Sequence, residues 1–174
     1  MYLTKLNHIK LSYASVVMWA YPDTPRLFKE LHSEILNNAN TNKKIVDLFP
    51  DIDGLVDDEA ALKIATEELY ASSYRAAIKE LLPLTKYYCH NTKQLEKLKA
   101  QPWFQFWNIL RNCWSHEMKF NFNGHEKSVL PVTWSGVTVD ISMNGRELKH
   151  GECSYEKIRE LIEEAESFIK NDLA

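Results

Sequence analysis

Apolar residues recur along most of the chain at the three- and four-residue steps of amphipathic helices. This spacing predicts four long helices, at residues 3–19, 25–37, 57–88 and 154–171. Two shorter helical segments are expected at residues 43–49 and 92–100. A polar loop is expected at residues 37–42 and an acidic turn at residues 51–59. Thr24 and Ser154 should cap the second and fourth long helices, and Pro83 should kink or split the third.

A further helix is predicted at residues 101–117, and its two faces differ sharply in composition. The apolar face is mostly aromatic and consists of Trp103, Phe106, Trp107, Leu110, Cys113 and Trp114. The opposite face carries Gln105, Asn108, Arg111, Asn112, Ser115 and His116. A solvated helix face is usually rich in charged residues, so this set indicates binding rather than solubility. Phe104 lies outside the apolar face and is expected at a dimer interface.

The residues after His116 alternate between polar and β-branched or aromatic types, which is typical of short strands. We expect a small antiparallel hairpin or three-stranded flap at about residues 119–150, inserted between the last two helices. The dipeptide Asn144-Gly145 favours a tight turn between the last two strands. The pattern therefore predicts a mainly α fold with a small β insertion.

Length and charge narrow the interpretation. A chain of 174 residues with a net charge of −3 is expected to form one domain, residues 1–174, without a global positive field that attracts nucleic acid. If a nucleic acid is a ligand, the basic groups that contact it must then be local, or come jointly from two subunits. Three widely spaced cysteines favour reduced thiols in the cytoplasm. The apolar run at residues 14–20 is too short to span a membrane, and no secretory signal is evident.

The polar face of residues 101–117 offers groups suited to phosphate chemistry. Arginine binds phosphate oxygens through a planar fork, and histidine exchanges protons near neutral pH. Asn112 and His116 lie one turn apart on the same side, whereas Arg111 and His116 diverge by roughly 140° on an ideal helix. One copy of the helix cannot easily direct both groups at a single atom, but two copies facing each other across a dyad could.

The segment Arg111-Asn112-Cys113-Trp114-Ser115-His116 resembles the signature of the HEPN superfamily. That signature is an arginine, four to six further residues and a histidine, often with a polar residue directly after the arginine, near the end of a helix. The layout is also similar, since HEPN domains are up-down helical bundles that dimerise so that two motif copies meet. The resemblance covers the whole layout loosely and this segment specifically.

The resemblance implies a homodimeric, metal-independent endoribonuclease that needs no cofactor and leaves a 2′,3′-cyclic phosphate and a 5′-hydroxyl. Arg111 would bind and stabilise the phosphate, His116 would act as acid or base, and Asn112 would orient His116 or contact the phosphate. Three neighbouring polar residues are expected to contact the RNA substrate: Asn108, Ser115 and Lys119. Many members act as toxins, in phage defence or in RNA processing.

Some toxin members have a protein antitoxin or a nucleotidyltransferase as partner, so such a partner is a further expectation. Met118 stands where some of them carry a tyrosine that the nucleotidyltransferase modifies, and that form of control is therefore not expected here.

Other interpretations stay open at this point. Some HEPN-like domains have lost catalysis and serve as dimeric interaction or nucleotide-binding modules, and in a plain helical structural protein the motif would be coincidence. Arg111 could pair with an acid such as Glu117, and His116 could favour the helix C-terminus as a cation. The mildly basic flap could contact RNA or simply be solvated. A zinc site could be drawn from Cys113, His116, His125, His150 and Cys153, but their spacing does not match the usual zinc fingers.

Overall fold

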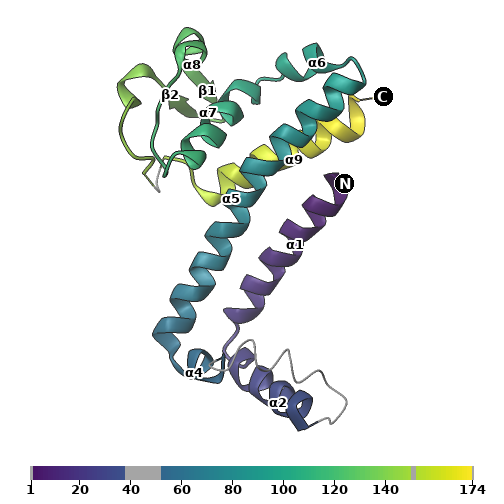
Figure 1. Cartoon of the computed structure of the whole chain (residues 1–174), viewed down its shortest axis with the longest axis vertical. Coiled ribbons are helices and arrows are strands. Elements are labelled where there is room, and N and C mark those ends of the chain that lie inside the picture. Colours follow the sequence, from purple (N-terminus) through teal and green to yellow (C-terminus); the bar gives the residue numbers. More distant parts are fainter. Residues whose placement is uncertain (1, 38–51, 150–151, 174) are drawn as a thin grey trace. The chain divides into compact units, whose positions relative to one another are not determined.

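A computed structural model describes residues 2–37, 52–149 and 152–173 of the protein (Figure 1). These residues are mainly helical and include a small two-stranded antiparallel sheet. No helix among them is long and apolar enough to cross a membrane. In chain order the elements are α1 (Tyr2–Trp19), α2 (Thr24–Asn37), α4 (Ile52–Asp57), α5 (Glu59–Asn91), α6 (Leu95–Lys99), α7 (Phe104–Ser115), α8 (Gly124–Val129), β1 (Val132–Trp134), β2 (Val137–Val139), η1 (Ile141–Met143) and α9 (Tyr155–Asn171).

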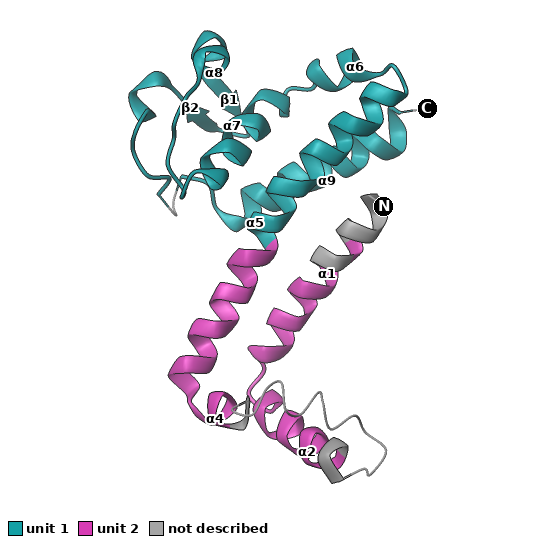
Figure 2. Cartoon of the chain, in the orientation of Figure 1, with its two compact units in different colours: residues 1–6, 74–174 teal, residues 7–73 magenta. Residues whose placement is uncertain are grey.

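The chain forms two compact units, which are coloured separately in Figure 2. Unit 1 comprises Met1–Leu6 and Tyr74–Ala174, and unit 2 comprises Asn7–Ser73. Helices α1 and α5 each contribute residues to both units. The expectation that residues 1–174 behave as a single domain stays a prediction.

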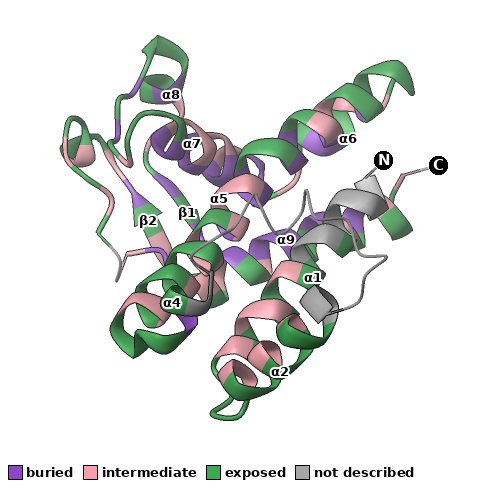
Figure 3. Ribbon diagram, turned by 60° about the horizontal axis from the view of Figure 1, so that its bottom comes forward, coloured by how far each residue is buried: buried purple, intermediate pink, exposed green. Residues whose placement is uncertain are grey.

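Helix α7 lies at the centre of the hydrophobic core of unit 1. The aromatic face predicted from the sequence is buried, with each side chain at most 8% exposed: Trp103, Phe106, Trp107, Leu110, Cys113 and Trp114. Trp107 donates from Nε1 to the main-chain carbonyl of Ile78 in α5 at 3.0 Å, and Trp103 packs edge-on against Phe168 of α9. Each ring buried in this way contributes roughly 1.5–3 kcal/mol. Buried residues accordingly gather on α5, α7 and α9 (Figure 3).

Helix α5 continues through Pro83, so of the two expected effects the proline does not split the helix, and the kink stays a prediction. A proline inside a helix removes one hydrogen bond and costs about 3 kcal/mol. The neighbouring residues Leu81, Leu82 and Thr85 are buried in the core of unit 1, and their packing offsets that cost. Pro83 itself is exposed.

The β structure after α7 is smaller than the alternating pattern predicted. β1 and β2 pair as an antiparallel hairpin, and Ser135-Gly136 joins them with both residues at positive φ. Asn144 and Gly145 do form a turn, with Gly145 at positive φ, but among the described residues it does not join two strands of the sheet. The Asn144 side chain instead accepts a hydrogen bond from the main-chain N–H of Phe122 at 3.0 Å. Within the described residues, the predicted third strand is reduced to an isolated bridge between Lys119 and Glu147.

A short helix, α8, occupies part of the segment that was expected to form strands. Asn123 and Glu126 form a capping box at its start, in which each side chain accepts a hydrogen bond from the other residue's main-chain N–H. This spacing of asparagine and glutamate is a known helix-start signal. It outweighs the local alternation, and Ser128 and Val129 are helical where a strand was expected.

Unit 2 contains few buried side chains. Among its described residues only Val56 of α4 is buried. Ring contacts join Tyr13 to Tyr70 and Trp19 to Phe28. Many of its large apolar side chains are at least 38% exposed: Leu11, Tyr13, Val17, Met18, Tyr21, Leu27, Leu31, Leu55, Ile64 and Leu69. Unit 2 therefore has a much smaller buried core than unit 1.

The other helices lie close to where apolar periodicity predicted them. Ser154 caps α9 as expected, since its hydroxyl accepts from the main-chain N–H of Lys157. Thr24 is instead the first residue of α2, and its hydroxyl donates to the main-chain carbonyl of Met18. The acidic turn expected at residues 51–59 contains helix α4, whose Val56 is buried. The loop and helix predicted over residues 38–49 lie outside the described residues.

Candidate functional site

The polar face of α7 lines an open groove of about 830 Å³ in unit 1. Asn108, Arg111 and Asn112 all face it, because positions three and four apart share one side of a helix. Helices α5 and α8 also contribute side chains to the groove. Its polar lining residues are Lys86, His90, Lys99, Gln105, Asn108, Arg111, Asn112, Asn123, His125 and Glu126.

The groove carries more positive than negative charge. Its lining includes two lysines, one arginine and two histidines, whereas Glu126 is the only carboxylate among the described lining residues. Both oxygens of Glu126 are engaged: Oε2 accepts from the main-chain N–H of Asn123 at 2.9 Å, and Oε1 accepts from the Asn112 side chain at 2.6 Å. Because Glu126 is only 4% exposed, its charge is directed at these donors rather than at solvent.

Asn112 connects this buried carboxylate to the motif arginine. Its amide nitrogen donates to Glu126 Oε1, and its amide oxygen accepts from Arg111 Nη1 at 2.8 Å. The asparagine therefore fixes the guanidinium through a neutral group. Within the described residues, Arg111 has no ion-pair partner, and its Nε is buried without a hydrogen-bond acceptor. The alternative in which Arg111 simply pairs with Glu117 is not supported.

Lys86 of α5 is a second half-buried cation in the same groove. Its ammonium donates to Asn108 Oδ1 and lies 5.2 Å from the centroid of the Phe104 ring. Burial and the nearby charge of Arg111 hold the pKa of Lys86 below its usual value. Lys86 is thus held by a neutral amide and an aromatic face, just as Arg111 is held by a neutral amide.

His116 lies outside this groove in the single chain. It follows the last residue of α7, and its side chain is exposed. Glu117 and Met118 directly after it both adopt positive φ, at 56° and 63°, a conformation that costs non-glycine residues roughly 1–2 kcal/mol each. The chain therefore turns sharply directly after His116, at the end of the helix that carries Arg111.

The three expected substrate-contacting residues do not lie together. Asn108 faces the groove, where it binds Lys86. The hydroxyl of Ser115 donates to the main-chain carbonyl of Arg111 at 2.9 Å, and Lys119 lies 4.0 Å from the Glu147 carboxylate. Both are exposed; Ser115 is the last residue of α7, and Lys119 follows in the segment after His116.

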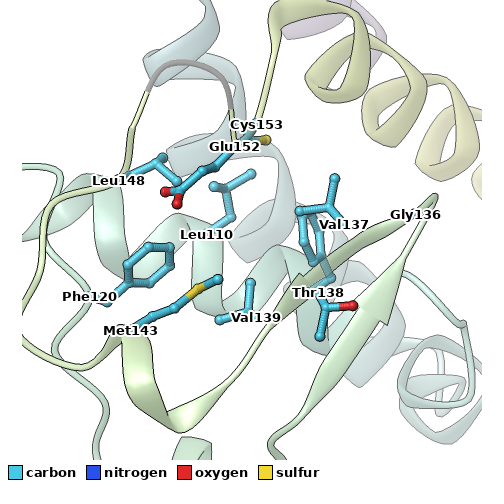
Figure 4. Close-up of a pocket in the computed structure, with 11 residues that line it drawn as sticks. Leu110, Phe120, Gly136, Val137, Thr138, Val139, Met143, Leu148, Glu152 and Cys153 are labelled. Carbon is cyan, nitrogen blue, oxygen red and sulfur yellow. The ribbon is translucent and has the colours of Figure 1, made fainter.

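A smaller cavity of about 270 Å³ lies behind α7, between Leu110 and strand β2 (Figure 4). Its lining is mostly apolar, and Figure 4 shows Cys153 and Glu152 at one side of it. Burial raises the pKa of the Cys153 thiol to about 12. Burial and the neighbouring Cys153 together raise the pKa of the Cys113 thiol to about 12 as well. These thiols are therefore poor nucleophiles at neutral pH.

The described residues do not form a metal-binding cluster. In the ranges that the structure describes, no three His, Cys, Asp or Glu side chains gather closely enough to hold an ion. His150, from which a zinc site could also be drawn, lies outside those ranges.

Sequence reasoning missed three participants of the groove. Phe104, expected outside the buried face of the helix, is only 5% exposed and lies beneath the ammonium of Lys86. Its expected place at a dimer interface stays a prediction. Lys86 could not be linked to the motif from the sequence, because it lies on a different helix. Glu126 could have been found from the capping-box spacing that begins at Asn123.

No protein-family model, no curated protein and no solved structure matches this chain.

Proposed function

We propose that this protein is a HEPN-like endoribonuclease that cleaves RNA without a metal ion. The observation that carries the proposal is the state of Arg111. It faces an open cationic groove, it is fixed in place by Asn112 and Glu126, and no carboxylate among the described residues neutralises it. An arginine held in this way suits a phosphodiester, whose oxygens match the planar fork of the guanidinium.

The proposed reaction needs one proton acceptor and one proton donor. A base removes the proton of the ribose 2′-hydroxyl, the 2′-oxygen attacks the adjacent phosphorus, and an acid protonates the 5′-oxygen as the bond between phosphorus and this oxygen breaks. The products are a 2′,3′-cyclic phosphate and a 5′-hydroxyl. Arg111 stabilises the additional negative charge on the phosphorane, and two imidazoles exchange the protons.

We place the two imidazoles on two protomers of a homodimer. His116 lies outside the groove of its own chain, and one chain offers one copy of it. A symmetric dimer offers two arginines and two histidines, enough for a base, an acid and charge stabilisation. A cytoplasmic toxin or phage-defence role, with a protein antitoxin as partner, is the biological setting that the resemblance favours.

The test is incubation of the purified full chain with a mixed RNA substrate in the presence of EDTA. Wild-type protein should produce fragments with 2′,3′-cyclic phosphate ends, and His116→Ala or Arg111→Met should lower the rate by about a hundredfold or more. His125→Ala is the matched control, because His125 lines the groove without belonging to the motif. Loss of cleavage in His125→Ala with retention in His116→Ala would contradict the assignment and place the proton transfer within one protomer.

A mixing experiment tests the dimeric site separately. Excess His116→Ala protein, allowed to exchange subunits with the wild type, should lower the wild-type rate because each mixed dimer lacks one of the two imidazoles. A rate that depends only on the wild-type concentration would exclude a composite site.

A second candidate function is a nucleotide-binding or interaction module without catalysis. The position of His116 outside the groove favours it, since binding requires only the groove. Absence of cleavage by the wild type, together with retained phosphate binding, would move the assignment to this module.

A further inference from the structure

Two cations face the same groove, and neither forms an ion pair with Glu126, the one carboxylate among the described residues that line it. Lys86 and Arg111 come from different helices, α5 and α7, and both line the groove. Each is tethered by a neutral amide on α7, Lys86 by Asn108 and Arg111 by Asn112. Within the described residues neither cation has an acidic side chain at ion-pair distance.

This arrangement costs free energy unless an anion binds there. Like charges repel, and the repulsion grows when the groups are partly removed from water. Consistent with this, the charge of Arg111 contributes to the lowered pKa of Lys86. A surface lysine can turn away from such a neighbour, but Lys86 is held over the Phe104 ring and by Asn108. The fold thus keeps the two charges together.

Donor groups are also left over at this place. A guanidinium has five N–H donors, and the described structure gives Arg111 one hydrogen bond through Nη1 while Nε is buried without an acceptor. Buried donors without partners are rare in folded proteins and point to a bound water or ion. A tetrahedral oxyanion accepts hydrogen bonds from an arginine fork and a lysine ammonium at the same time.

We infer that Lys86 and Arg111 of one protomer together form an oxyanion-binding site, and that its ligand is a phosphate group. Lys86 is then a substrate-binding residue that acts beside Arg111. The site is complete within one chain and needs neither His116 nor a second protomer. That the phosphate belongs to RNA rests on the proposed function, whereas the two-cation site does not.

The test is a titration of inorganic phosphate into the ¹⁵N-labelled full chain, at constant ionic strength maintained with chloride, followed by NMR. The side-chain amides of Asn108 and Asn112 report directly on the site. Wild-type protein should show saturable shifts in these signals, and Lys86→Met should weaken binding by about tenfold or more, because a charge-assisted hydrogen bond is lost. Methionine keeps an unbranched side chain of similar length and removes only the charge that lies over the Phe104 ring.

Lys99→Met is the matched control. Lys99 lines the same groove and its removal changes the net charge equally, but it pairs with Glu96 at 2.7 Å. The affinity of the Lys99→Met variant for phosphate should stay within about twofold of that of the wild type. Equal losses in both variants would show a diffuse electrostatic effect and would overturn the inference, as would a wild-type chain that binds no phosphate.

A second variant keeps the test independent of how well Lys86→Met folds. Asn108→Asp is nearly isosteric and places a carboxylate on Lys86, so phosphate binding should fall by about tenfold or more. Unchanged binding in this variant would overturn the inference. RNA cleavage measured in parallel separates the two proposals. Phosphate binding that depends on Lys86 without any cleavage supports the site and rejects the ribonuclease. Cleavage unaffected by Lys86→Met supports the ribonuclease and rejects Lys86 as a residue that binds its substrate.

Discussion

Arg111 illustrates how a single charged residue can be positioned without being neutralised. A direct carboxylate partner would hold the guanidinium but would also compete with a phosphate ligand. The neutral Asn112 transmits the restraint from Glu126 and leaves the positive charge available. The sequence-based role of Asn112 was to orient His116 or contact the phosphate, and its hydrogen bonds now favour the orientation of Arg111.

Glu126→Gln tests this restraint. Glutamine has the same shape, but its NH₂ group would face the donor of either Asn112 or the Asn123 main chain. We expect a loss of about 1–3 kcal/mol in the free energy of unfolding, measured by urea denaturation. Glu163→Gln, an exposed change on α9, should stay within about 0.5 kcal/mol of the wild type. Equal stability of both variants would contradict the role of Glu126.

The buried thiols give a prediction about reactivity. With the pKa of Cys113 and Cys153 at about 12, roughly one thiol in ten thousand is ionised at pH 8. Labelling of the native protein by a thiol-disulfide reagent should therefore be slow at both positions and become fast in urea, as mass spectrometry of the labelled peptides would show. Rapid native labelling of either cysteine at pH 8 would contradict the burial described here.

At the scale of elements, the two faces of α7 have different roles. Its aromatic face is the centre of the core of unit 1, and its polar face is one side of the groove. The same helix therefore fixes Arg111 and stabilises the fold. Helix α5 complements it, because the hydrogen bond from Trp107 to Ile78 ties the helix that carries Arg111 to the helix that carries Lys86.

Trp107→Phe should weaken that connection. The substitution removes the indole N–H donor and leaves a small cavity, for an expected cost of roughly 1–3 kcal/mol. For a chain of this size, this corresponds to about 2–4 °C in Tm for each kcal/mol, measured by circular dichroism. Trp19→Phe is the control, because Trp19, the last residue of α1, is only half-buried. A larger loss in Trp19→Phe would contradict the central position of α7.

At the scale of the whole molecule, the two units differ in how much they bury. Unit 1 contains the aromatic core and the groove, whereas Val56 is the only buried side chain among the described residues of unit 2. Local stability follows the density of buried apolar contacts. Unit 2 should therefore open more easily than unit 1.

Hydrogen exchange followed by mass spectrometry measures this difference. Amides of α2 and of the α5 residues in unit 2 should exchange at least about tenfold faster than those of α7 and α9, since opening there exposes little additional apolar surface. Protection as strong as in α7 would contradict the prediction and would mean that the exposed apolar side chains of unit 2 are covered in solution.

The sequence alone was sufficient for features that depend on neighbouring residues. Apolar periodicity located most helices and the buried face of α7, because a helix places residues three and four apart on one side whatever the rest of the chain does. The same periodicity placed Asn108, Arg111 and Asn112 on the opposite face. It was less reliable where local signals conflicted, as in α8, where the capping box at Asn123 outweighed a strand-like alternation.

Only the tertiary structure decided which residues share the groove with that face. Lys86 lies on a different helix, and the ring of Phe104, expected outside the buried face of α7, is buried beneath the ammonium of Lys86. Glu126 reaches Asn112 because the chain turns sharply after α7 and returns as α8. Such pairings depend on the packing of segments far apart in the sequence, and a local pattern contains no information about them. Helix periodicity determined the face, and packing between helices determined the site.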